Sequence, residues 1–291
     1  MVGYIGVNGA GKSTTIKMLT GILAPSGGSV RVLGRDPNQE RVANARDIGV
    51  VFGQRSQLWW DLAYQESLNL IARIYDVPEA RYRALLGRFT EELSLGELLS
   101  VPVRSMSLGQ KMRAELAATL IHEPRVVYLD EPTIGLDIVV KERIREFIRE
   151  QNRASGLTVL LTTHDLGDIE ELCERVIIID SGRPIFDGSI ATIKERFSRH
   201  RLISFETAGR PGPLVLPTGV SLEAQQERRV TLRFDRSLQS ASSVAASVMN
   251  QLEVLDLSVQ EPDLASVIRQ IYGGADPSGA PAMEGLEARV A

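Results

Sequence analysis

Short, continuously apolar runs along this chain alternate with segments whose apolar residues recur every three or four positions. The apolar runs predict buried strands, at 2–5, 48–52, 126–129, 158–161 and 176–179. The periodic segments predict helices, including those at 15–23 and 138–154. Such alternation predicts an α/β fold with a mostly parallel sheet that is covered by helices on both faces.

Helical spacing dominates one block inside this series. Apolar residues recur at helical positions over 64–75 and 79–94, and a further helix begins near Gln110. We therefore expect an inserted α-helical subdomain at about residues 62–122. Before it, Val30 and Val32 alternate with polar residues after a glycine-containing turn, which predicts a half-buried strand.

The pattern changes near residue 200. Runs at 202–205, 230–234 and 255–259 predict strands, and helices are expected at about 238–251 and 263–272. The chain is therefore expected to have a main domain over 1–199 and a small C-terminal α+β extension over 200–272. The stretch 273–291 is rich in glycine, proline and alanine and is expected to be a disordered tail.

Composition narrows the possible partners. The chain has 291 residues with 43% hydrophobic and 24% charged residues, which is ordinary for a globular protein. Its net charge of −4 argues against nucleic acid as the main partner. The single cysteine, Cys173, excludes an internal disulfide and suits a reducing compartment. It is expected to lie in the core.

The first strand leads into a phosphate-binding loop pattern, Gly6 through Ser13, and then into a helix. Glycines let successive backbone N–H groups point at an anion, beside the positive end of the helix. Lys12 is expected to reach the β- and γ-phosphates, and Ser13 to ligate Mg²⁺. A chance glycine turn is the alternative, which the flanking strand and helix argue against. The expected nucleotide-binding residues here are Asn8, Gly9, Gly11, Lys12, Ser13 and Thr14.

Other predicted strands end in side chains that suit phosphoryl transfer. Asp130 and Glu131 follow the strand at 126–129, at the edge where a phosphate loop sits in such sheets. Asp130 suits Mg²⁺, and Glu131 suits a general base or a group that orients water; a solvated acidic turn is the alternative. His164 would hydrogen-bond the γ-phosphate or the water, and Gln54 would sense Mg²⁺ or water. Taken alone, a histidine or a glutamine at such a place is more often structural, and only the combination of motifs favours these roles.

In this order, the motifs resemble those of the ATP-binding subunit of ABC transporters, over residues 1 to about 195. The resemblance rests on the phosphate loop, Gln54, Ser107-Leu108-Gly109-Gln110, Leu129 through Thr133, Gly135-Leu136-Asp137 and Thr163-His164-Asp165. It implies that Gln54 is the Q-loop glutamine and His164 the switch histidine. It also implies that the signature and the D-loop contact ATP held by an opposite subunit, through Ser107, Gly109, Gln110 and Asp137. An ordinary helix cap is a further role open to Ser107.

The stretch 52–62 and the C-terminal unit resemble type-2 ABC exporter subunits, the drug, lipid and polysaccharide exporter group. This resemblance implies an ATPase that uses ATP and Mg²⁺, closes as a dimer with a second ATP-binding subunit, and drives export through a separate membrane permease. It would lie in the cytoplasm at the inner face of the membrane. Two alternatives are a soluble ABC-type ATPase not coupled to transport and an inactive, truncated nucleotide-binding remnant.

Two features depart from the family pattern. Leu108 stands where the signature usually has glycine, so the γ-phosphate cap is expected to differ. The strands and the adenine-stacking aromatic residue that ordinarily precede the loop are missing, so the natural chain is expected to begin upstream of Met1.

Two adjacent tryptophans, Trp59 and Trp60, follow Gln54 closely. Because neighbours in a helix or strand point in different directions, at least one is expected to be exposed, in a groove that receives a permease helix. One core and one rim tryptophan is the structural alternative.

Overall fold

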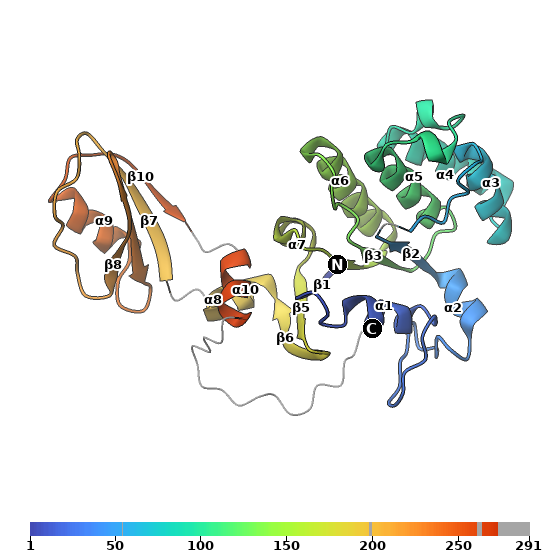
Figure 1. Cartoon of the computed structure of the whole chain (residues 1–291), viewed down its shortest axis with the longest axis horizontal. Helices are drawn as coiled ribbons and strands as arrows, with labels where there is room; N and C mark the ends of the chain where they lie inside the picture. Colours follow the sequence, from blue (N-terminus) through green and yellow to red (C-terminus); the bar gives the residue numbers. More distant parts are fainter. Residues whose placement is uncertain (54, 198–199, 261–263, 273–291) are drawn as a thin grey trace. The chain divides into compact units, whose positions relative to one another are not determined.

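A computed structural model describes residues 1–53, 55–197, 200–260 and 264–272 of the chain (Figure 1). The predictions for Gln54 and for the tail at 273–291 lie outside these residues. The chain divides into two compact units, of which the first is Met1–Gly188 and the second begins at Ser189.

The first unit is built on a six-stranded sheet of order β2-β3-β4-β1-β5-β6. The strands are β1 (Val2–Gly6), β2 (Ile48–Phe52), β3 (Val126–Asp130), β4 (Thr158–Thr162), β5 (Arg175–Asp180) and β6 (Arg183–Ser189). All pairings from β2 through β5 are parallel. Because β3, β4 and β1 are neighbours in this order, the segments that follow them meet at one edge of the sheet.

Helices cover both faces of this sheet (Figure 1). Ile16 of α1 (Lys12–Leu19) packs with Tyr128 and Leu160 on one face. Side chains alternate along a strand, so the buried Val127 and Leu129 point to the other face, where α5 (Leu108–Leu120) and α6 (Ile138–Ser155) lie. The remaining helices around the sheet are α2 (Arg41–Asp47) and α7 (Leu166–Leu172). The predicted α/β fold with a mostly parallel sheet is confirmed.

An α-helical block is inserted between β2 and β3. It contains α3 (Tyr64–Ile74), α4 (Glu79–Glu92), two short 3-10 helices (Gly96–Leu98 and Val103–Ser105) and α5 (Leu108–Leu120). The fully buried Tyr64 donates its hydroxyl to the carbonyl oxygen of Ala114 at 3.0 Å, which joins α3 to α5. Phe89 meets Phe147 of α6 edge-on, with ring centroids 5.4 Å apart. This aromatic pair joins the block to the sheet domain.

The strand expected around Val30 and Val32 does not form. Val32 and Arg35 instead close a tight turn, with reciprocal backbone hydrogen bonds of 2.9 and 3.0 Å. Leu33 and Gly34 at the tip both have positive φ, which matches a hairpin turn. Alternation alone predicts a strand, but a strand also needs a neighbour to pair with, and none lies beside it among the described strands.

The first helix ends earlier than expected, at Leu19 rather than near residue 23. Strands β6 and β8 are not predicted by the hydrophobic pattern, because both are largely exposed along their length. Their polar sequences carry little of the periodicity that marks a buried face.

The second unit is a four-stranded antiparallel sheet of order β10-β7-β9-β8. Its strands are β7 (His200–Thr207), β8 (Val220–Gln226), β9 (Arg229–Asp235) and β10 (Val254–Gln260). Helix α9 (Ala241–Met249) covers one face, where Val244 and Val248 pack on Phe205 and Leu232. Helices α8 (Ile190–Phe197) and α10 (Leu264–Tyr272) pack against each other. No helix in the described part of the chain is long and apolar enough to cross a membrane.

Candidate functional site

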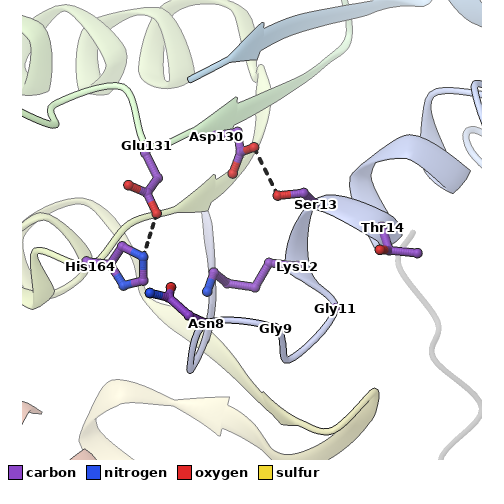
Figure 2. Close-up of a pocket in the computed structure, with 9 residues that line it drawn as sticks. All are labelled: Asn8, Gly9, Gly11, Lys12, Ser13, Thr14, Asp130, Glu131 and His164. Carbon is purple, nitrogen blue, oxygen red and sulfur yellow. Dashed lines mark hydrogen bonds and ion pairs between the residues drawn. The ribbon is translucent and has the colours of Figure 1, made fainter. Parts of the chain in front are cut away.

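A cavity of about 260 Å³ lies at the sheet edge where the segments after β1, β3 and β4 meet. It brings together residues predicted from three separate parts of the chain (Figure 2): Asn8, Gly9, Gly11, Lys12, Ser13, Thr14, Asp130, Glu131 and His164. The parallel order of the strands explains this meeting, because each segment leaves its strand in the same direction.

Lys12 lies at the base of the phosphate loop and is only 8% exposed. Its Nζ donates to the carbonyl oxygens of Gly6 at 2.7 Å and Val7 at 3.3 Å. Burial lowers the pKa of Lys12, and the nearby carboxylates of Glu131 and Asp130 oppose that shift. Gly11 has a φ of 109°, a conformation that glycine adopts without steric cost, and it turns the loop into α1. The ammonium group is therefore held inside the loop, at the floor of the cavity.

Ser13 and Asp130 lie next to each other at the cavity (Figure 2). The Ser13 Oγ donates to Oδ2 of Asp130 at 3.3 Å. The other carboxylate oxygen accepts from the Thr162 hydroxyl at 2.5 Å, which fixes the orientation of Asp130. A hydroxyl and a carboxylate oxygen are hard ligands of the kind that Mg²⁺ prefers, and this ion usually takes few ligands from protein. The two side chains therefore fit a magnesium ion.

Glu131 and His164 form the second pair at the cavity. Nε2 of His164 lies 2.7 Å from Oε1 of Glu131 (Figure 2). Glu131 has a φ of 56°, the left-handed region that is costly for a residue with a side chain. Its N–H donates to the carbonyl oxygen of Thr162 at 2.9 Å, which holds this conformation. Strained backbone of this kind is concentrated at functional sites.

The other predicted contact residues are not at this cavity. Ser107, Gly109 and Gln110 lie at the start of α5, and Asp137 caps the start of α6. Ser107 and Gln110 form reciprocal capping hydrogen bonds of 2.8 and 3.3 Å, so Ser107 does cap the helix. None of these four residues lines the cavity around the phosphate loop.

The structure also shows polar residues that the motifs did not single out. Thr162 ends the strand before His164, a place that the sequence predicts. Its pairing with Asp130 in the sheet, and the hydrogen bond from its hydroxyl to that carboxylate, appear only in the structure. Glu115 of α5 accepts from the Ser56 hydroxyl at 2.6 Å and from the Gln57 N–H at 2.9 Å. Burial raises the pKa of Glu115, although these hydrogen bonds oppose the shift. No sequence spacing marks that contact, because the partners come from separate elements.

Comparison with known proteins bears on what this site does. The ABC transporter family profile matches residues 1–134. The daunorubicin resistance ATP-binding protein DrrA3 of Streptomyces coeruleorubidus is 32% identical over 275 residues, which cover 93% of this chain and 86% of that protein. The daunorubicin/doxorubicin resistance ATP-binding protein DrrA of Streptomyces peucetius is 31% identical over 277 residues, which cover 93% of this chain and 83% of that protein.

A solved ATP-binding subunit of an ABC transporter is also similar, with a TM-score of 0.63 and 31% identity. The match covers 68% of this chain and 81% of that one. The resemblance to ABC transporter ATP-binding subunits, and within them to the drug-exporter group, is confirmed. The chain therefore belongs to the ABC transporter family, as an ATP-binding subunit whose ATPase activity is coupled to transport.

Proposed function

We propose that the cavity at the phosphate loop is the catalytic site of the ATPase, and that hydrolysis there powers export through a separate membrane permease. The observation that carries this proposal is the 2.7 Å contact between Glu131 and His164, opposite the Ser13–Asp130 pair. One cavity of about 260 Å³ is then lined by the proposed base with its histidine neighbour and by the proposed metal-binding pair. The positively charged side chain of Lys12 lines the same cavity.

The phosphate loop holds the triphosphate in this proposal. Asn8, Gly9, Gly11 and Thr14 line the loop side, where backbone N–H groups and the start of α1 favour an anion. The Lys12 ammonium moves from the loop carbonyl oxygens to the β- and γ-phosphates. A bound phosphate also opposes the effect of burial on the Lys12 pKa, because it stabilises the charged form.

Ser13 and Asp130 would hold Mg²⁺ in this proposal, and Gln54 is the third group assigned to it. When bound, the ion would supply positive charge that offsets the negative charge of the phosphates. Thr162 keeps the Asp130 carboxylate oriented through the hydrogen bond to its other oxygen.

Glu131 acts as the general base on the attacking water. A carboxylate accepts the proton as the water oxygen bonds to phosphorus and the bond to the ADP oxygen breaks. His164 lies close enough to orient Glu131 and to hydrogen-bond the γ-phosphate or the water.

The site is completed by a second subunit in this proposal. Ser107, Gly109, Gln110 and Asp137 lie away from the cavity of their own chain, so a head-to-tail partner brings them to the γ-phosphate. The capping bond uses the Ser107 oxygen as acceptor, which leaves its O–H able to donate to a phosphate. ATP then bridges the two ATP-binding subunits and stabilises the closed state, and hydrolysis releases it.

A permease at the membrane is the remaining partner. The chain is an ATP-binding subunit, and no described helix could itself span a bilayer, so we place it at the inner face of the membrane beside a separate permease. Co-purification of the chain with an integral membrane protein supports this assignment. Co-purification with ribosomes alone contradicts it and favours an ABC-type ATPase without a transport role.

The variant Glu131→Gln tests the catalytic proposal. The amide cannot accept the proton, so hydrolysis is expected to fall about 10² to 10⁴-fold while ATP binding persists. The ATP-bound dimer should then accumulate on size-exclusion chromatography. Glu146→Gln, at an exposed position of α6, is the matched control and should hydrolyse ATP at the parental rate.

Lys12→Ala separates binding from chemistry in the same assay. Losing a charged hydrogen-bond donor costs about 1.5–3 kcal/mol, which weakens ATP binding roughly 10- to 100-fold. Parental hydrolysis by Glu131→Gln, or parental ATP affinity in Lys12→Ala, would show that the site is assigned wrongly.

A further inference from the structure

A fully buried carboxylate lies beneath the catalytic edge of the sheet. Asp168 of α7 is 0% exposed. Its Oδ2 accepts hydrogen bonds from the hydroxyl groups of Thr133 and Thr163, the latter at 3.2 Å. Both threonines are themselves buried, at 1% and 5% exposure. None of these three residues lines the ATP cavity, so none is needed there as a ligand.

Arg145 of α6 pairs with the other oxygen of this carboxylate. Its Nε and Nη2 donate to Oδ1 of Asp168 at 2.8 and 2.5 Å. The Nη1 group of the same arginine reaches outward to Glu171 at 3.0 Å. A buried carboxylate is costly unless its charge and its lone pairs are satisfied. Asp168 meets that condition with donors from α6 and from two loops, and its orientation is therefore tightly restricted.

The two threonines occupy informative places in the chain. Thr133 follows Glu131 by two residues, and Thr163 directly precedes His164. The loops after β3 and β4 are thus tied to one carboxylate, at points next to the pair whose side chains are 2.7 Å apart. Asp165 strengthens the second loop, because its N–H donates to the Thr163 hydroxyl at 2.9 Å and its carboxylate accepts from Lys141 at 2.7 Å.

We propose that Asp168 is a positioning residue for hydrolysis, which sets the distance between Glu131 and His164 by holding Thr133 and Thr163 together. The proposal rests on the catalytic roles assigned above to Glu131 and His164. Asp168 does not touch ATP or water. It acts by restricting two loops that separate strands would otherwise place independently.

The physical reason is the sensitivity of catalysis to position. A displacement of about 1 Å in a reacting group can lower the rate roughly a hundredfold. Glu131 is already held in a costly backbone conformation, so it needs support from its surroundings. Loosening the Thr133 anchor should therefore lower the rate of the chemical step and leave the phosphate loop, which binds ATP, unchanged.

Thr133 provides the sharpest test, because valine matches threonine in shape and lacks only the hydroxyl. Thr133→Val is expected to lower kcat about 10- to 100-fold, with the affinity for ATP unchanged. Thr133→Ser keeps the donor and should restore most of the rate. The measurements are steady-state ATP hydrolysis and equilibrium binding of a fluorescent ATP analogue. A merely structural threonine would lower the melting temperature without this split between kcat and affinity.

Asp168→Asn examines the carboxylate itself, and Glu171→Gln is its control. Both residues contact Arg145, but Glu171 does so from the exposed side and is not tied to either loop. Asp168→Asn should lower kcat, and Glu171→Gln should not. If Asp168→Asn fails to fold because Arg145 loses its buried partner, the threonine pair still decides the question.

Three results would overturn the proposal. They are a parental kcat in Thr133→Val, an equal loss in Thr133→Ser, and a loss of kcat in Thr133→Val that is matched by a loss of ATP affinity. A double variant distinguishes failure of the Asp168 proposal from failure of the catalytic role assigned to Glu131. If Asp168 acts through Glu131, Thr133→Val should add no further loss in a Glu131→Gln background. Full activity of Glu131→Gln alone contradicts the catalytic assignment instead.

Discussion

Leu108 is a single residue that changes how the signature meets its surroundings. It is half exposed at the start of α5, at a place where glycine is usual in the family pattern. A Cβ added to Gly135 would lie 3.2 Å from Cδ2 of Leu108. The leucine side chain therefore packs directly on the glycine. Gly135 has a φ of 70° and precedes Asp137 by two residues. The leucine therefore joins the signature to the D-loop within one chain.

Gly135→Ala tests this contact, with Gly156→Ala as its matched control. Gly156 has nearly the same φ, 68°, but a Cβ there meets nothing within 4 Å. Both variants should lose about 1–2 kcal/mol of unfolding free energy, because a side chain is disfavoured at positive φ. Only Gly135→Ala displaces Leu108, so only this variant should also hydrolyse ATP more slowly. Urea unfolding and an ATPase assay measure the two effects, and equal rates in both variants would contradict the role of Leu108.

Three elements of the first unit meet at His122, just beyond α5. Its ring stacks on Tyr75 after α3, with centroids 3.9 Å apart, and its Nε2 lies 3.0 Å from the carbonyl oxygen of Ile48 in β2. Because that oxygen can only accept, Nε2 carries the proton. Nδ1 is buried and has no hydrogen-bond partner among the residues that the structure describes. The neutral imidazole therefore suits this environment. A second proton, on Nδ1, would place a buried charge and a donor there without an acceptor.

The stability of this junction should depend on pH. Burial lowers the pKa of His122 below the ordinary 6.5, although the hydrogen bond to Ile48 and the charge of Asp47 oppose the shift. As the pH falls below 6.5, the unfolded chain gains the proton first, so the stability present at higher pH is lost. His122→Gln keeps an N–H donor and cannot titrate.

Urea unfolding at about pH 7.5 and about pH 5.5 compares the two proteins over the range in which histidine titrates. The parent should lose more unfolding free energy than His122→Gln between these conditions. An equal loss in both would mean that His122 does not titrate in the expected direction.

At the scale of the whole molecule, the first unit has two adjacent exposed tryptophans on its surface. Trp59 and Trp60 are 39% and 57% exposed, so neither is the core tryptophan of the structural alternative. Lys111 of α5 lies over the Trp60 ring, 4.3 Å from its centroid. Tryptophan is common at the energetic centre of interfaces. These side chains remain our proposed contact with the permease.

Replacing Trp59 and Trp60 together by alanine should weaken binding to the permease and leave ATP hydrolysis by the isolated chain unchanged. The reason is that the pair lies outside the ATP cavity. The measurement is the amount of chain that co-sediments with washed membranes from cells that make the transporter. Ile74→Ala, which alters another exposed apolar residue of the same helical block, is the control. Membrane binding that is equal in both variants would remove the tryptophans from the interface.

The sequence by itself determined those features that depend on residues close together in the chain, namely most of the strands and helices and the phosphate loop. Apolar runs and helical spacing predicted β1 to β5 and most of the helices, because burial imposes these periodicities locally. The phosphate loop was recognisable because its strand, glycines, lysine and helix are contiguous from Val2 to Leu19. Exposed strands such as β8 were missed, since little of their length packs on a core.

Only the tertiary structure decided the contacts within the candidate site. Ser13 and Asp130 are 117 positions apart in the chain, and the Asp168 link to Thr133 joins residues 35 positions apart. These contacts exist because β1, β4 and β3 are neighbours in the sheet, which no local pattern specifies. The left-handed backbone of Glu131 is likewise invisible in the sequence, since glutamate ordinarily avoids it. Residue types therefore indicated the chemistry, and the order of the strands decided which of those residues meet.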